Sequence, residues 1–97
     1  MRYEIVLAPE AVRDFKALKA HVRPAVREAI ELHLRHQPTR TSRSRIKRLR
    51  GMSRPQFRLR VEEVRVFYDV HGKTVQVLAV VPKSEADAWL REVGEKS

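Results

Sequence analysis

Residues 56–82 read QFRLRVEEVRVFYDVHGKTVQVLAVVP, and apolar side chains recur there at nearly every second position. This period is typical of β-strands, whose successive side chains point to opposite faces of a sheet. The alternation restarts twice and predicts three strands, at residues 57–61, 64–70 and 75–81. Of the two short connections, Glu62-Glu63 and His71-Gly72, only the second has the glycine that favoured tight turns use. The pattern therefore predicts a three-stranded antiparallel meander.

The chain before the meander predicts a strand followed by two helices. Residues 2–7 alternate toward β-branched side chains and favour a strand. Helical spacing then links three apolar residues, Ala11, Phe15 and Leu18. After a break at residues 21–23, a second helix is expected to start at Pro24 and to end before Pro38. Two short helices in succession favour an antiparallel hairpin.

The remaining segments predict a loop and a final helix. Residues 39–45, TRTSRSR, show no periodicity and predict a mobile basic loop, which Ile46 and Leu49 would anchor. After the meander, Ser84 is expected to cap a short C-terminal helix. The resulting order β-α-α-β-β-β-α predicts an α+β fold, in which the helical pair packs on one face of a largely antiparallel sheet.

Length and composition exclude several classes of protein. A chain of 97 residues suits one domain, expected to span residues 1–97, and the absence of cysteine excludes a disulfide framework and a thiolate metal site. The longest apolar run, residues 77–82, is far shorter than the about 20 residues of a membrane span, and a signal-peptide pattern is missing, so a cytoplasmic protein without a membrane partner is expected. The four histidines and three glycines match neither a metal motif nor a phosphate-binding loop, so no metal and no cofactor is expected.

The net charge of +9 comes from one segment of the chain. Residues 38–60 contain no acid, and their cations are Arg40, Arg43, Arg45, Lys47, Arg48, Arg50, Arg54, Arg58 and Arg60. Such a block produces a one-sided positive field, which attracts a polyanion or an acidic protein. The alternative is a solvated loop that keeps the protein soluble.

The predicted hairpin at Glu62-Glu63 brings arginines together. Its register places Arg60 opposite Arg65 and Arg58 opposite Phe67. Like charges that face each other destabilise a sheet, so the arrangement favours a function, namely a guanidinium cluster suited to bidentate phosphate contacts. The alternative is charge that protects an exposed edge against aggregation. Phe67, Leu78 and Val80 are expected to share this face, which suggests that a partner or the last helix covers part of it.

Four segments of this chain together resemble a known family. They are residues 3–5 (YEI), 11–18 (AVRDFKAL), 46–51 (IKRLRG) and the strand pair at 57–61 (FRLRV) and 64–68 (VRVFY). From the first strand to about Val81, the chain resembles the RelE/ParE superfamily of bacterial type II toxins. RelE members cut messenger RNA in the ribosomal A site without a metal: the 2′-hydroxyl attacks the adjacent phosphate, and basic residues stabilise the transition state. The resemblance implies an mRNA endoribonuclease that inhibits translation, with a cognate antitoxin, the ribosome and mRNA as partners.

The same resemblance assigns candidate residues. Arg58 and Arg60 occupy the paired basic positions of the second strand of the family pattern, Arg65 the arginine of the third, and Lys83 lies near the C-terminal basic residue, so these four are the catalytic candidates. The candidates for RNA binding are Arg43, Arg45, Lys47, Arg48, Arg50, Arg54 and Trp89. Arginine keeps its proton, so the proton acceptor must be another group, a substrate oxygen or water.

The last segment departs from the family pattern and leaves other functions open. Nucleases of the family often carry Tyr or His there, whereas the nearest aromatic residue here is Trp89, which can stack on a base but cannot titrate. Trp89 also suits core packing. The departure favours, as an alternative, a ParE-like inhibitor that binds DNA gyrase without catalysis. A basic binding module without toxicity is the third reading.

Overall fold

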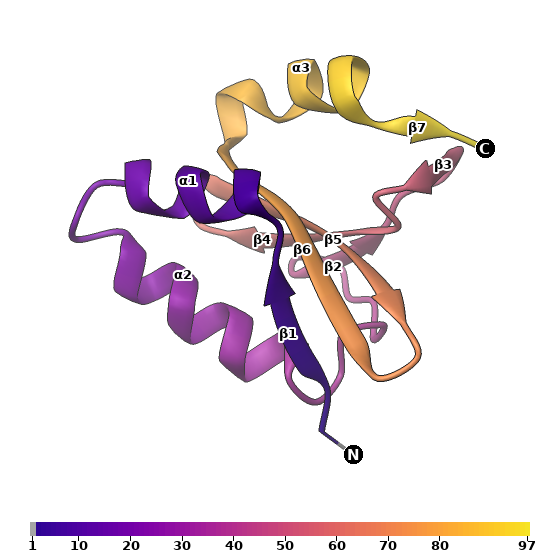
Figure 1. Ribbon diagram of the computed structural model, residues 1–97, viewed down its shortest axis with the longest axis horizontal. Helices are drawn as coiled ribbons and strands as arrows, with labels where there is room; N and C mark the ends of the chain where they lie inside the picture. The colour runs from indigo at the N-terminus through magenta and orange to yellow at the C-terminus, as the bar shows by residue number, and fades with distance from the viewer. Residues whose placement is uncertain (1) are drawn as a thin grey trace.

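A five-stranded mixed sheet forms the centre of the fold in the computed structural model, which describes residues 2–97 (Figure 1). Its strand order is β1-β6-β5-β4-β2, with β1 parallel to β6 and the other neighbours antiparallel. The strands are β1 (Glu4–Leu7), β2 (Ile46–Arg48), β4 (Phe57–Val61), β5 (Val64–His71) and β6 (Thr74–Pro82). The helices are α1 (Pro9–Ala17), α2 (Arg23–Ala29), which continues as the π-helical turn η1 (Ile30–Leu34), and α3 (Lys83–Val93). A separate two-stranded sheet pairs β3 (Met52–Arg54) with β7 (Glu95–Lys96).

The predicted α+β fold and its meander are confirmed. In the β4–β5 pair, Arg60 is the partner of Arg65 and Arg58 that of Phe67, as the sequence register required. The first turn reverses the chain with Glu62 at a positive φ of 52°, although it lacks glycine. In the second hairpin His71 pairs with Thr74, so the turn is Gly72-Lys73, one residue later than predicted.

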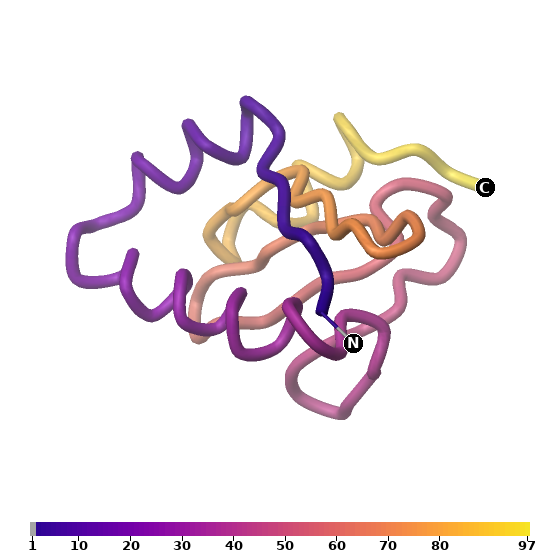
Figure 2. The backbone as a smooth tube through the Cα atoms, turned by 60° about the horizontal axis from the view of Figure 1, so that its bottom comes forward, coloured from indigo at the N-terminus to yellow at the C-terminus, as the bar shows by residue number. Residues whose placement is uncertain are grey.

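The helical hairpin covers one face of the sheet, as predicted, and the main core lies between them. Figure 2 shows the chain turning back between α1 and α2. The fully buried members of this first core are Ala11, Val26, Leu34, Leu59, Val66, Tyr68, Val75 and Val77. The Tyr68 hydroxyl donates a hydrogen bond of 2.6 Å to the carbonyl oxygen of Pro38, which satisfies the polar end of this buried ring.

The opposite face is covered by the last helix, which answers the question of what shields Phe67. Phe67 and Ala79 of the sheet form a second core with Ala86 of α3, and Leu49, Trp89 and Leu90 pack against it. Figure 1 shows α3 and α2 on opposite sides of the strands. Each face of the sheet therefore has its own small core.

A β-bulge in β6 corrects one prediction about this face. Phe67 pairs with Ala79 and Tyr68 with Val77, so Leu78 is an extra residue that reverses the alternation. Val80 consequently lies in the first core and does not share the face of Phe67. Its backbone N–H donates a hydrogen bond of 3.0 Å to the carboxylate of Asp14 in α1. The sequence alternation cannot reveal a bulge, because it counts residues without knowing which of them is paired.

The segment before the meander is more ordered than predicted, because Ile46, expected as an anchor, begins strand β2 and a further short strand, β3, follows it. Residues 39–45 contain neither helix nor strand. The last helix begins at Lys83 after Pro82, so Ser84 lies within its first turn and is not the N-cap. Within residues 2–97, no helix is long and apolar enough to cross a bilayer.

Candidate functional site

A cavity of about 380 Å³ opens between the sheet and α3 and brings four cationic side chains together. They are Lys47 of β2, Arg58 of β4, Arg65 of β5 and Lys83 at the start of α3. The strand register explains part of this grouping, because Lys47 pairs with Arg58 across β2 and β4 and all three strands are neighbours. We call this space the arginine cavity. It contains three of the four catalytic candidates.

Arg65 is held rigidly in the wall of the arginine cavity. Only 6% of the residue is exposed, and its guanidinium donates hydrogen bonds to the carbonyl oxygens of Glu62 at 2.7 Å and Val64 at 3.1 Å. Burial lowers the pKa of Arg65, the positive charge of Arg60 lowers it further, and Glu63 opposes the shift. Backbone carbonyls of the tight turn thus fix the direction of a cation that no acid within residues 2–97 pairs with.

Arg58 also lines the cavity, and it carries one unused hydrogen-bond donor. Its Nε atom is buried and has no hydrogen-bond partner within residues 2–97. Burial lowers the pKa of Arg58, and the charges of Arg65 and Arg60 lower it further. A buried donor without an acceptor costs about 1–3 kcal/mol, and more when the group is charged. An anion in the cavity would reduce the repulsion between the arginines.

Arg60, the fourth catalytic candidate, stands apart from the cavity. It is exposed and does not line the cavity, although its charge acts on both Arg58 and Arg65. Lys83 is fixed at the cavity rim, because its backbone N–H donates a hydrogen bond of 2.7 Å to the carbonyl oxygen of Glu63. The structure therefore brings Arg58 and Arg65 together in one cavity, as predicted. Lys83 joins them there, whereas Arg60 lies outside the cavity.

Asp87 is a charged residue of the cavity that is not among the candidates predicted from the sequence. It is the only carboxylate among the described residues that line this space. The sequence contains a pattern that groups Asp87 with the catalytic candidate Lys83. The residues at positions 83, 86, 87 and 90 have the spacing of one helix face, and all four line the cavity. The same described residues, 2–97, contain no group of three His, Cys, Asp or Glu side chains arranged to hold a metal ion.

The candidates for RNA binding have different surroundings. Lys47 lines the arginine cavity, whereas Arg45 lines a second pocket on the other side of β2. Arg54 forms a 3.5 Å ion pair with the buried carboxylate of Asp69. Three others are exposed: Arg43, Arg48 and Arg50.

Arg48 and Trp89 both make contacts within the fold. The guanidinium of Arg48 donates a hydrogen bond of 2.7 Å to the carbonyl oxygen of Gln56 and lies over the ring of Phe57. The indole of Trp89 stacks on Phe67, with ring centroids 5.0 Å apart and an interplanar angle of 7°. The indole face that meets Phe67 is therefore not available to a base.

Comparison with known proteins identifies the family. A sequence model described as the ParE toxin of the type II toxin-antitoxin system parDE matches residues 5–87. The chain belongs to the ParE toxin family. It is a toxin of a type II toxin-antitoxin system within the RelE/ParE superfamily, as the resemblance indicated. No match to a curated protein sequence was found.

Solved structures similar to this chain include toxins of type II systems, alone or in complex with an antitoxin. The archaeal RelE-RelB complex from Pyrococcus horikoshii is similar with a TM-score of 0.69 and 21% identity, covering 86% of this chain and 97% of that one. The toxin-antitoxin complex RelBE2 from Mycobacterium tuberculosis is similar with a TM-score of 0.67 and 26% identity, covering 84% of this chain and 99% of that one. A mutant of the Escherichia coli toxin RelE in the free state gives 0.68 and 22%, covering 92% of each chain.

Proposed function

We propose that this ParE-family toxin is a ribosome-dependent endoribonuclease that cleaves messenger RNA in the arginine cavity. The observation that carries the proposal is a cavity lined by Arg58, Arg65 and Lys83, two arginines and a lysine that form no ion pair with an acid within residues 2–97. A phosphodiester is the anion that suits such planar, multiple donors. The likeness to RelE structures supports the same function.

The reaction is an internal transfer of the phosphoryl group. The 2′-oxygen of the substrate forms a bond to the adjacent phosphorus, and the bond from phosphorus to the 5′-oxygen of the next nucleotide breaks. The products are a 2′,3′-cyclic phosphate and a 5′-hydroxyl. One proton leaves the attacking hydroxyl and one is added to the departing oxygen. Negative charge accumulates on the non-bridging oxygens, which is where fixed donors accelerate the reaction.

The residues of the cavity divide this work. Arg65 is already fixed by two carbonyl oxygens, so its guanidinium stabilises the transition state with little reorganisation. Arg58 lines the same cavity and offers its guanidinium to a non-bridging oxygen. One such donor is worth about 3 kcal/mol in a preorganised site. Asp87 is the proton acceptor for the 2′-hydroxyl in this proposal, and the ammonium of Lys83 donates the proton to the 5′-oxygen.

The proposal includes an antitoxin as partner. The structures from Pyrococcus horikoshii and Mycobacterium tuberculosis are toxin-antitoxin complexes. The net charge of +9 here favours an antitoxin with an acidic segment that covers the basic surface. Covering the arginine cavity would exclude RNA and neutralise the toxin.

The alternative function is inhibition of DNA gyrase by binding. Two observations favour it. The sequence model that matches this chain is described as a ParE toxin. In the C-terminal segment, where nucleases of the superfamily often carry Tyr or His, the aromatic residue is Trp89, and it packs on Phe67. A gyrase inhibitor of this kind would act through its surface. The arginine cavity would then be dispensable for toxicity.

One pair of assays separates the two functions. The full chain is added to a translating extract, where primer extension maps cuts in a defined mRNA, and in parallel to a gyrase supercoiling reaction. We expect cuts in ribosome-bound mRNA, none with Arg58→Gln, and wild-type cutting with Arg13→Gln, which alters an exposed arginine of α1 outside the cavity. Inhibition of supercoiling by wild type and Arg58→Gln alike, without cuts, would reject the nuclease.

A further inference from the structure

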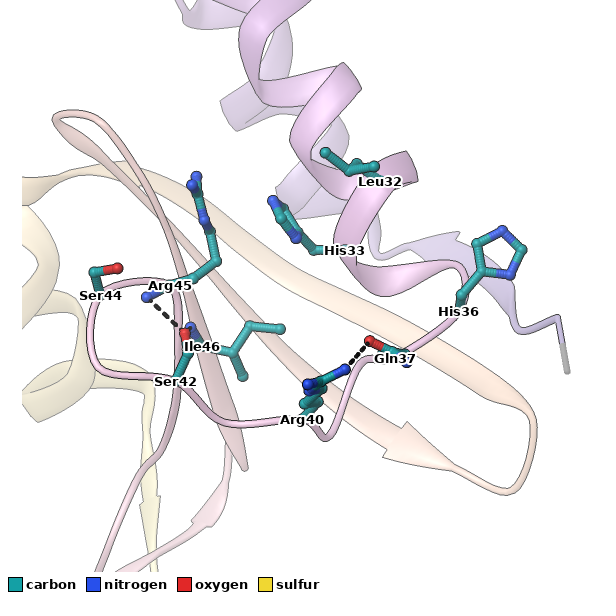
Figure 3. Close-up of a pocket in the computed structure, with 9 residues that line it drawn as sticks. All are labelled: Leu32, His33, His36, Gln37, Arg40, Ser42, Ser44, Arg45 and Ile46. Atoms are coloured by element: carbon teal, nitrogen blue, oxygen red, sulfur yellow. Dashed lines mark hydrogen bonds between the residues drawn. The ribbon is translucent and has the colours of Figure 1, made fainter.

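A second cationic pocket lies outside the arginine cavity. It has a volume of about 340 Å³ and is enclosed by the end of η1 and the loop at residues 37–45 (Figure 3). We call it the loop pocket. The residues that matter for its chemistry are His33 of η1 and Arg40, Ser42, Ser44 and Arg45 of the loop. No acid lines it among the residues that the structure describes.

Hydrogen-bond donors converge on this pocket from two sides. Figure 3 shows the imidazole of His33 and the side chain of Arg45 reaching toward the same space from opposite walls. The hydroxyl oxygen of Ser42 accepts hydrogen bonds from the backbone N–H groups of Arg45 at 3.0 Å and Ile46 at 3.3 Å. Both lone pairs of that oxygen are thus used, and its hydrogen is left to donate. Several donors without an acceptor favour an anion with several oxygens, which is the chemistry of phosphate.

Electrostatics favour an anion at the same place. Burial lowers the pKa of His33, and the positive charge of Arg45 lowers it further. The charge of Arg45 therefore disfavours the charged form of His33, and an anion between the two side chains would relieve this repulsion. The C-terminal end of η1 carries a partial negative charge that repels an anion. This charge, about half an elementary charge, is smaller than the two positive charges of Arg40 and Arg45.

The loop pocket and the arginine cavity lie on the two sides of one strand. Ile46 is buried in the first core and lines the loop pocket, whereas its neighbour Lys47 lines the arginine cavity. Successive residues of a strand point to opposite faces, and this explains the arrangement. Because β2 is the outermost strand of the sheet, no further strand separates the two sites at this edge. A flexible polyanion can pass from one site to the other over β2.

We propose that the loop pocket binds a second phosphate of the RNA strand whose scissile phosphate occupies the arginine cavity, so that the RNA passes over the edge of β2. This inference rests on the proposed function, because it takes RNA as the ligand. His33 and Arg45 are the residues that hold the second phosphate. Neither contributes to the chemical step.

The test measures binding of an RNA that cannot be cleaved. A single-stranded hexanucleotide with a 2′-O-methyl group on every sugar lacks the attacking hydroxyl, and fluorescence anisotropy gives its affinity for the full chain at several salt concentrations. Each phosphate contact with single-stranded nucleic acid contributes about 0.7 to the slope of log K against log salt. We expect Arg45→Gln to reduce this slope by about 0.7 and to weaken binding about fivefold at about 0.1 M salt. His33→Gln should also weaken binding, and Arg13→Gln should match wild type.

Two outcomes would overturn the inference. Equal affinity and slope for Arg45→Gln and Arg13→Gln would show that the loop pocket does not touch RNA. Inorganic phosphate that shifts the NMR signals of His33 in wild type but not in Arg45→Gln, with RNA affinity unchanged, would indicate a site for free phosphate. The cleavage assay in translating extract is a separate measurement. RNA binding that depends on Arg45, without cleavage by wild type, would support the loop pocket and reject the nuclease. Cleavage by wild type, with RNA binding that does not depend on Arg45, would support the nuclease and reject the loop pocket.

Discussion

Arg60 of β4 lies directly opposite Arg65 of β5, and the two side chains have different environments. Arg65 is 6% exposed and bound to the carbonyl oxygens of Glu62 and Val64, whereas Arg60 is exposed to solvent. Two like charges at facing positions of a sheet are unfavourable. Hydrogen bonds hold Arg65 in place despite this repulsion. Its guanidinium donates them to the carbonyl oxygens of Glu62, in the turn, and Val64, at the start of β5. The same contacts direct a cation into the arginine cavity.

Replacing Arg65 should therefore affect both stability and activity. Arg65→Ala removes two hydrogen bonds made by a buried guanidinium, so we expect the free energy of unfolding to fall by about 1–3 kcal/mol. Cleavage should be lost even where the variant is fully folded. Urea unfolding measures the first effect and primer extension the second. Arg60→Ala is the matched control, expected to stay within about 0.5 kcal/mol of wild type because its side chain is exposed. Equal stability of the two variants would contradict the role of the turn carbonyls.

Arg58 should show a conflict between stability and function. Arg58→Met keeps much of the side-chain volume but removes a buried donor that has no acceptor within residues 2–97. We expect the melting temperature to stay equal or to rise, because removal of an unsatisfied polar group is neutral or stabilising. Cleavage should fall by about 10²–10³, the cost of one preorganised donor. Thermal unfolding and the cleavage assay measure the two effects. A large loss of stability would mean that Arg58 has a structural role that its free Nε does not reveal.

Trp89 is expected to act as a packing residue. Its indole stacks on Phe67 within the second core. Trp89→Ala should lower the free energy of unfolding by about 2 kcal/mol, less than the about 3–5 kcal/mol of a fully buried aromatic residue. Trp89→Phe retains a ring over Phe67 and should recover most of this loss. Trp89 is the single tryptophan, so its fluorescence reports on RNA directly. Strong quenching by the methylated hexanucleotide would contradict packing and favour base stacking.

The sequence predicted those parts of the fold and site that depend on local patterns. Alternation and a two-residue turn were enough to pair Arg60 with Arg65, because the period and the turn together fix the register. The strands β2 and β3 were missed, since three residues are too few to show a period. The bulge at Leu78 and the cavity on which Asp87 lies depend on how the strands pair and how α3 packs on the sheet. The helical spacing of α3 groups Asp87 with Lys83, but it does not show which part of the sheet that helix face meets.

His33 gives a prediction about pH. Burial and then the charge of Arg45 lower its pKa below the ordinary value of 6.5, so the folded state binds fewer protons than the unfolded state as the solution is acidified. The stability that depends on neutral His33 is therefore complete above pH 6.5 and is lost as the pH falls through the lowered pKa.

We expect His33→Gln to remove this part of the pH dependence. Urea unfolding between about pH 5 and 8 should show a smaller loss of stability on acidification in the variant than in wild type. The other three histidines are unchanged in the variant, so their contributions cancel in the difference. His36→Gln is the matched control, because His36 is exposed just after η1 and Figure 3 shows its ring directed away from Arg45. If both variants respond to acid alike, the burial of His33 beside Arg45 is not what makes the folded state sensitive to acid.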